Sequence, residues 1–149
     1  MSGYKEIIEK EKQNILVLKN KVLVDFFVDI VEPEINIAYL VFVDGIYAVS
    51  GAIGSEIITM IQTDSIHLQI ENKQLKQFEP YSIFLNKKII QVRNIGEEWN
   101  GHGFEISFEG MYDKTMILQS IYTGDNPEGY DDCIRLGVGQ YYYSYDKGN

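Results

Sequence analysis

The first residues of the chain repeat apolar positions with the period of an α-helix. Two lysines, Lys19 and Lys21, follow the repeat, where positive charge favours the negative end of a helix dipole. This pattern predicts a helix over residues 3–19. The face that it would bury contains Tyr4, Ile7, Ile8, Glu11, Ile15 and Leu18.

From residue 22 the period changes to two, and β-branched and aromatic residues become frequent, as is typical of strands. Segment 56–63 is compatible with a helix or a strand, and 72–78 suggests a short helix that Pro80 closes. The predicted fold class is α+β: one N-terminal helix packed on a mostly antiparallel sheet, with residues 1–149 as a single domain. The expected strands are 22–31, 35–43, 46–50, 66–70, 88–95, 104–108, 115–123, 133–136 and 140–145.

One short string recurs in the chain. Asp44-Gly45-Ile46-Tyr47 is echoed 65 positions later by Glu109-Gly110-Met111-Tyr112. Asp44-Gly45 predicts a type I′ hairpin turn, in which both central residues have positive φ. At the same offset Tyr39, Val41 and Val43 match Phe104, Ile106 and Phe108. Two interpretations stay open: two similar hairpin units over 22–70 and 88–145, or two generic hairpins of one sheet.

Charge is unevenly distributed in this chain of 149 residues with a net charge of −9. Residues 22–72 contain eight carboxylates and no Lys or Arg, and residues 97–149 contain ten carboxylates against three basic groups. Such a field repels nucleic acid and anionic membranes, so neither is an expected partner. It favours a basic protein partner, although acidity also serves solubility alone.

Catalytic motifs are absent from the sequence. The two histidines are His67, expected on the solvent face of a strand, and His102, in a loop rich in Gly and Asn. Cys133 has no clear activating neighbour except Arg135. No phosphate-binding, nucleophile-elbow or EF-hand pattern occurs. We therefore predict no catalytic residues, no cofactor and no metal site.

The expected location is the cytoplasm. The N-terminal residues are charged and amphipathic, unlike a secretory signal. The segment 22–31 is too short and too polar to span a bilayer. A single cysteine fits a reducing compartment.

Aromatic residues next to carboxylates in the second half suggest a contact surface. In this hypothesis the carboxylates mimic phosphates against a basic cleft, with Trp99 and Tyr142 as anchors. Small acidic bacterial immunity proteins, which inhibit basic nuclease toxins, have a similar profile of size and charge. Two alternatives remain: an enzyme or small-ligand-binding domain that uses the second-half loops, and a structural subunit of a homodimer. The predicted partner-binding residues are Glu97, Glu98, Trp99, His102, Asp125, Glu128, Tyr130, Asp131, Asp132 and Tyr142.

Overall fold

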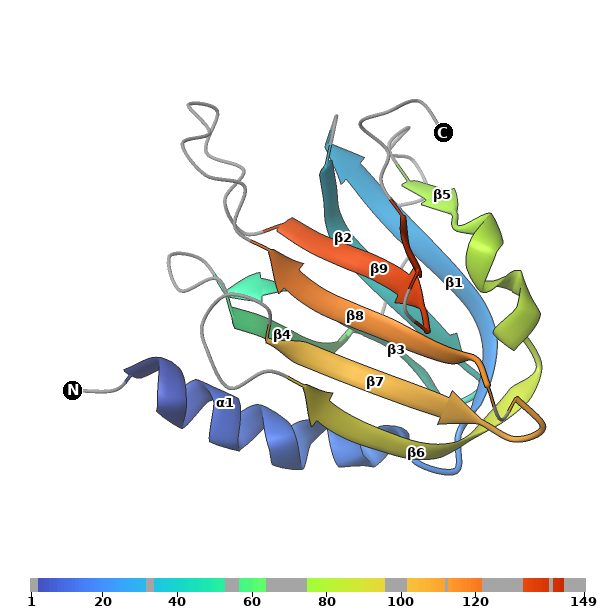
Figure 1. Ribbon diagram of the computed structural model, residues 1–149, viewed down its shortest axis with the longest axis horizontal. Helices are drawn as coiled ribbons and strands as arrows, with labels where there is room; N and C mark the ends of the chain where they lie inside the picture. The colour runs from blue at the N-terminus through green and yellow to red at the C-terminus, as the bar shows by residue number, and fades with distance from the viewer. Residues whose placement is uncertain are drawn as a thin grey trace.

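The computed structural model describes residues 3–31, 34–52, 57–63, 75–95, 102–111, 113–121, 133–139 and 141–143 (Figure 1). Helical segments precede two runs of strands. The elements are α1 (Gly3–Asn14), the 3-10 helix η1 (Ile15–Leu18), β1 (Val22–Val31), β2 (Glu34–Phe42), β3 (Gly45–Ala52), β4 (Ile57–Thr63), β5 (Leu75–Gln77), the 3-10 helix η2 (Glu79–Phe84), β6 (Lys87–Ile95), β7 (Gly103–Phe108), β8 (Thr115–Ile121), β9 (Cys133–Val138) and β10 (Tyr141–Tyr143).

The N-terminal helix begins and ends close to the predicted bounds. Its last turn tightens into η1, and Asn20 then ends it in a left-handed conformation with φ of 76°. On the predicted apolar face, Glu11, Ile15 and Leu18 are buried. Helical periodicity was therefore a sufficient guide to which side of this segment packs against the sheet.

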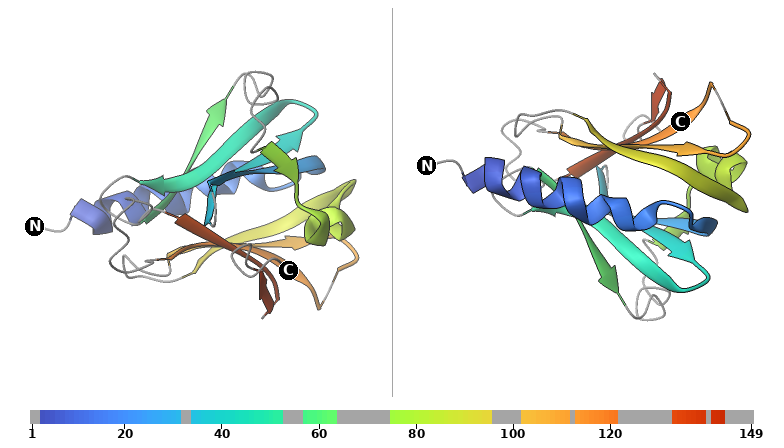
Figure 2. Two further views of the ribbon diagram at one scale, coloured as in Figure 1. Left: turned by 90° about the horizontal axis from the view of Figure 1, so that it is seen from above. Right: turned by 90° about the horizontal axis from the view of Figure 1, so that it is seen from below.

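The strands form one antiparallel sheet, as predicted. The hydrogen-bonded order is β10-β9-β8-β7-β6-β1-β2-β3-β4, with β5 beside β1. An additional pair, Ile35 of β2 with Ile134 of β9, closes six of these strands (β1, β2, β9, β8, β7 and β6) into a ring. Figure 2 shows the first and second runs of strands as two layers, with α1 lying across one side between them.

The core lies between the two layers and is rich in aromatic rings. Phe84 of η2 stacks on Phe108 of β7 with 4.7 Å between ring centroids, and Tyr81 meets Phe26 edge-on at 4.8 Å. Burying a side chain such as Phe84 contributes about 1.5–3 kcal/mol. The short helix η2 therefore joins the first layer, through Phe26, to the second, through Phe108.

The hairpins β1–β2 and β6–β7 share one register. Leu23 pairs with Phe42, and Ile89 pairs with Phe108, which places both partners 66 positions later. A β-bulge follows at the same place in each hairpin, after Leu23 and after Ile89. Bulges are specific features of a strand rather than generic ones, so their coincidence relates the two hairpins more closely than the turn residues do.

The two 3-10 helices also end alike. Asn20 follows η1 and Asn86 follows η2, both with positive φ. The N–H of Asn20 donates to Ile89 O at 2.8 Å, and the N–H of Asn86 donates to Leu23 O at 2.6 Å. These reciprocal bonds relate the start of β1 to the start of β6 by an approximate twofold axis.

The structure corrects the internal alignment by one residue. At the true offset of 66, the equivalents of Phe104, Ile106 and Phe108 are Ala38, Leu40 and Phe42, and all six are buried. The expected match to Tyr39, Val41 and Val43 was wrong, and Val43 is 89% exposed. A one-residue shift exchanges the two faces of a strand, so only one alignment preserves the core.

The same shift moves the first turn. Phe42 pairs with Gly45, so Val43 and Asp44 are the two turn residues. Neither has positive φ, and the predicted type I′ turn centred on Asp44-Gly45 was wrong. In the connection between β7 and β8, which contains the second string, Gly110 does adopt a positive φ of 82°. The reason for the shift is that Phe42 belongs to the core and must end the inward-facing series of β2.

The predictions for residues 56–80 needed further correction. Residues 57–63 form a strand, which resolves the ambiguity at 56–63. The predicted helix over 72–78 was wrong where it is described, because Leu75–Gln77 is strand β5 paired with β1. Pro80 lies in the first turn of η2 instead of closing a helix, since a helix start has no use for the N–H that proline lacks. The predicted strand 66–70, with His67, lies outside the described residues.

Two side chains of α1 attach the helix to the edge strand β4. Glu11 Oε1 accepts a hydrogen bond from Met60 N at 3.1 Å, and Asn14 Nδ2 donates to Met60 O at 2.6 Å. Asn14 Nδ2 also donates to Glu11 Oε1 at 3.2 Å. The N–H and the C=O of Met60 are thus both hydrogen-bonded on the side of β4 that does not face β3. The two side chains therefore cover part of the edge of the sheet.

Burial makes the Glu11 contact pH-dependent. Desolvation raises the pKa of Glu11 above its ordinary value of 4.5, against the opposing effect of the hydrogen bonds from Asn14 and Met60. The folded state therefore holds the proton more tightly than the unfolded state does. The contribution of Glu11 to stability is complete below about pH 4.5 and is lost as the pH rises through the raised pKa.

We expect Glu11→Gln, which keeps the acceptor oxygen without the charge, to gain stability relative to the wild type as the pH rises from 4.5 to 7. Urea unfolding at several pH values measures this difference. Glu11→Ala should cost about 1–3 kcal/mol at both pH values, because it leaves the buried Met60 N–H without its acceptor. If the difference in unfolding free energy between Glu11→Gln and the wild type stayed constant with pH, the conclusion that burial raises the pKa of Glu11 would be contradicted.

Candidate functional site

Most of the predicted partner-binding residues belong to two connecting segments. Eight of them lie outside the described residues: Glu97, Glu98, Trp99, Asp125, Glu128, Tyr130, Asp131 and Asp132. The first three lie in the chain between β6 and β7, and the other five between β8 and β9. Tyr142 belongs to β10, where its backbone pairs with Gly137, and its side chain is outside the described part.

The strand ends that carry these segments lie side by side. Gly103 at the start of β7 pairs with Ile95 at the end of β6 and with Gln119 near the end of β8. Ile121 at the end of β8 pairs with Cys133 at the start of β9. In Figure 1 the end of β6, the start of β7, the end of β8 and the start of β9 lie at the same end of the sheet. The fold thus anchors both acidic segments at one end of the second layer.

A third acidic connection is anchored beside them. Ile35 at the start of β2 pairs with Ile134 at the start of β9, next to Cys133. The connection between β1 and β2 contains Glu32. Closure of the ring of strands therefore brings the start of β2, from the first half of the chain, next to the strand ends that carry the acidic segments of the second half.

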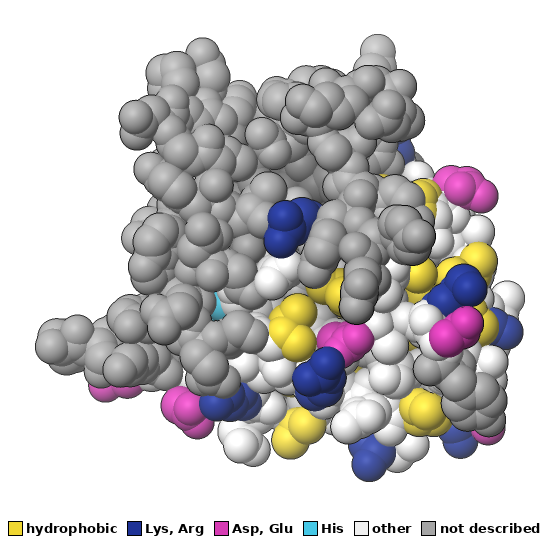
Figure 3. All heavy atoms as spheres, in the orientation of Figure 1, with side chains coloured by type: hydrophobic (Ala, Val, Ile, Leu, Met, Phe, Trp, Pro, Cys, Tyr) yellow, Lys and Arg dark blue, Asp and Glu magenta, His cyan; other side chains and the backbone are white. Residues whose placement is uncertain are grey.

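Five of the connections between strands differ sharply in charge from the rest of the chain. Together, residues 32–33, 53–56, 64–74, 96–102 and 122–132 contain 10 of the 22 Asp and Glu residues but only one of the 13 Lys and Arg residues, which gives them a net charge of −9. The rest of the chain contains 12 acidic and 12 basic residues. On the face in Figure 3, the described basic, acidic and hydrophobic side chains are intermixed. Acidity is thus a property of the segments that connect the strands.

His102 does not fit the predicted contact surface. It is fully buried immediately before β7, so a partner cannot reach its side chain, and its assignment to a loop surface is corrected. Its Nε2 lies 2.9 Å from Asn94 Oδ1 of β6. Gly103 and Phe104, which follow it, are buried as well. The burial of this stretch turns the imidazole inward toward α1.

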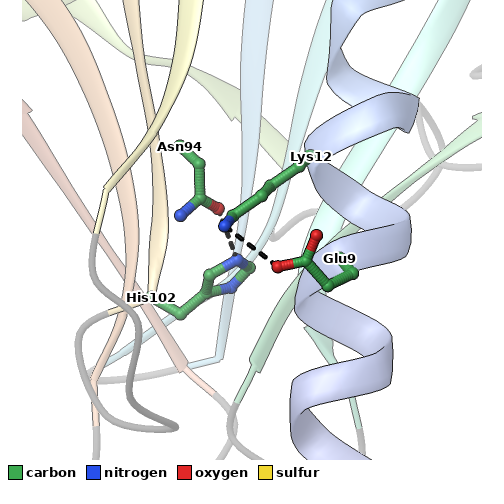
Figure 4. Close-up of polar contacts among 4 residues, drawn as sticks. All are labelled: Glu9, Lys12, Asn94 and His102. Carbon is green, nitrogen blue, oxygen red and sulfur yellow. Dashed lines mark hydrogen bonds and ion pairs between the residues drawn. The ribbon is translucent and has the colours of Figure 1, made fainter.

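The surroundings of His102 are those of a structural junction (Figure 4). Lys12 of α1 points toward His102 and Asn94, and its ammonium lies 3.0 Å from Glu9 Oε2. Asn94 orients the imidazole ring, while burial separates the ring from any substrate in solvent. The hydrogen bond between Asn94 and His102 thus joins β6 to the residue that precedes β7, on the side that faces α1.

In the part of the chain that the structure describes, no three His, Cys, Asp or Glu residues lie close enough together to hold a metal ion. Among the helices that the structure describes, none is sufficiently long and apolar to cross a membrane.

Sequence reasoning missed a second polar feature, a small pocket between β1, β5 and η2. Its lining comes from residues 25–26 and from residues 77–85, which are far apart in the chain. Pairing of β1 with β5, in which Phe27 meets Gln77, brings the two stretches together. No local motif signals such a site, because the residues become neighbours only through this strand pair.

Comparison with known proteins returned no match to any family model, curated protein or solved structure.

Proposed function

We propose that this protein binds a basic partner protein through the acidic segments at one end of its sheet, as an inhibitor of the immunity-protein type would do in the cytoplasm. The observation that carries the proposal is the partition of charge. A neutral framework anchors, at adjacent strand ends, the segments that contain Glu97, Glu98 and the carboxylates between 125 and 132. Such separation is typical of surfaces that select partners by charge.

Physically, the carboxylates would take the positions that nucleic acid phosphates occupy in the cleft of a basic nuclease toxin. Long-range attraction would raise the association rate, and Trp99 and Tyr142 would supply apolar contact once the surfaces meet. His102 has no part in this contact because it is buried. The proposal requires no catalytic group and no cofactor.

The first test is affinity capture from the source cells with the intact chain, followed by mass spectrometry and binding kinetics with the purified partner. The decisive variant replaces the six carboxylates Glu97, Glu98, Asp125, Glu128, Asp131 and Asp132 with their amides. We expect its association rate to fall by about tenfold or more at low salt, and the salt dependence of that rate to flatten.

A matched control neutralises two exposed carboxylates of the framework, Glu109 and Asp113. This control should change the association rate little, because these residues lie between β7 and β8, at the opposite end of these strands from the acidic segments. Unchanged kinetics in the six-residue variant would contradict the proposal. Absence of any partner, together with a mass that rises with concentration in light scattering, would support the homodimer alternative instead.

A further inference from the structure

The pocket between β1, β5 and η2 combines an apolar floor with an acidic rim. Phe26, Phe78, Tyr81 and Leu85 line it together with Asp25, Gln77, Glu79 and Ser82. Its volume is about 140 Å³. A cavity of about 150 Å³ accommodates a group the size of benzene, so this pocket is large enough for one side chain rather than for a cofactor.

The rim is organised around Asp25. Its Oδ1 accepts hydrogen bonds from Phe26 N at 2.9 Å and from Gln77 Nε2 at 3.0 Å. A carboxylate has four acceptor positions, and these two bonds leave capacity for a further donor. Glu79, at the start of η2, is exposed and adds a second negative charge, and none of the described residues that line the pocket is Lys or Arg.

The internal relation between the hairpins shows that a strand and a 3-10 helix in this arrangement do not require the same side chains. At the offset of 66, Asp25 corresponds to Gln91 and Phe26 to Val92. Tyr81 of η2 corresponds to Ile15 of η1, by the same offset that relates Asn86 to Asn20. At the equivalent place in the other half, β6 and η1 therefore occur without the carboxylate of Asp25 or the rings of Phe26 and Tyr81, and the residues equivalent to β5 (9–11) belong to α1.

We propose that this pocket receives a single Arg or Lys side chain from a basic partner protein. These side chains consist of an apolar stem and a charged tip. The stem would lie against the apolar floor, and the tip would bond to Asp25 and Glu79 at the rim. The identity of the carrier, a basic protein, rests on the proposed function; the affinity of the pocket for the cationic side chain does not.

The test is an NMR titration of the intact, ¹⁵N-labelled chain with N-acetyl-arginine amide, N-acetyl-lysine amide and the neutral analogue N-acetyl-citrulline amide. We expect saturable shifts in the millimolar range for the backbone amides of Phe26, Gln77 and Glu79 with at least one of the two cations. Citrulline amide should bind at least about tenfold more weakly, the effect expected when two partly exposed ion pairs are absent. Amides around Gln91, in the equivalent place of the other half, should not shift.

The decisive variant is Asp25→Asn with Glu79→Gln, which keeps the acceptor oxygen for Phe26 N and Gln77 Nε2. Its affinity for the cation should fall by about tenfold, whereas Glu109→Gln should leave it unchanged. Equal binding of citrulline amide, or unaltered binding by the double variant, would overturn the proposal. If the pocket binds the cation but neutralising the carboxylates of the connecting segments leaves partner binding intact, only the proposed function is contradicted. If neutralising those carboxylates weakens partner binding but the pocket does not bind the cation, only the pocket proposal is contradicted.

Discussion

Replacing Gly103 with alanine is expected to destabilise the fold by about 3 kcal/mol or more. A Cβ atom at this position would overlap Leu118 O, and it would lie 2.6 Å from Gln119 Cα. Both obstacles belong to the backbone of β8, which pairs with Gly103, so neither can rotate away. The substitution must instead separate β7 from β8 at the end of the sheet that anchors the acidic segments. Chemical denaturation of the purified variant measures the loss.

Gly45→Ala is the matched control. Its new Cβ would meet Gln62 Nε2 at 2.8 Å, the far end of an exposed and flexible side chain. The amide can move aside, so we expect a stability change within about 0.5 kcal/mol. If Gly103→Ala were as stable as Gly45→Ala, the close approach of β7 and β8 would be wrong.

Replacing Tyr81 with phenylalanine should cost about 2–3 kcal/mol, although it removes a single oxygen atom. That hydroxyl is buried, lies 2.6 Å from Ile117 O and 2.9 Å from Gly137 O, and accepts the N–H of Gly137 at 2.9 Å. Without it, a backbone donor and at least one backbone acceptor of β8 and β9 lose their partner in an apolar environment. Unfolding in guanidinium chloride, with an unchanged dependence on denaturant, would report this loss directly.

Ser82→Ala removes a hydroxyl from the neighbouring residue of η2, which is exposed. Its stability should remain within about 0.5 kcal/mol of the wild type, since water satisfies an exposed hydroxyl. Comparable losses in both variants would show that Tyr81 does not hold β8 and β9 through its oxygen.

Tyr81 and Glu11 perform related tasks in the two halves. Glu11 belongs to α1, which precedes β1, and bonds to the backbone of β4; Tyr81 belongs to η2, which precedes β6, and bonds to the backbone of β9. The chemistry differs, with a phenol in one case and a carboxylate beside an amide in the other. Sequence comparison misses this similarity because the two residues are not at equivalent positions: at the offset of 66, Tyr81 corresponds to Ile15 and Glu11 to Gln77.

Local patterns in the sequence were sufficient for the fold class and for most of the elements. Alternation of apolar residues predicted β1 over its full length and β6 and β7 to within one residue. Helical periodicity identified the buried face with Glu11, Ile15 and Leu18. Such patterns are reliable because each reflects a repeat within one element, whose buried face must be continuous.

The same reasoning was less successful wherever the outcome depended on two distant segments. The one-residue error in the internal alignment arose because the Asp-Gly and Glu-Gly strings were matched by turn chemistry, whereas the core selected the register through Phe42 and Phe108. His102 was assigned to a surface from its Gly- and Asn-rich neighbours, yet its side chain is fully buried and faces α1. Neither result is encoded in the residues adjacent to the position.

The amino-acid sequence by itself determined the fold class, the helix and most of the strands, and the net charge of −9, because these depend on local periodicity and composition. The tertiary structure alone decided that six strands close into a ring and that Asp25 and Glu79 line the same pocket. It also decided that the ends of β6 and β8 lie beside the starts of β7 and β9. The physical reason is that strand pairing joins residues tens of positions apart, and the free energy that selects those pairs comes from the shared core rather than from either strand alone.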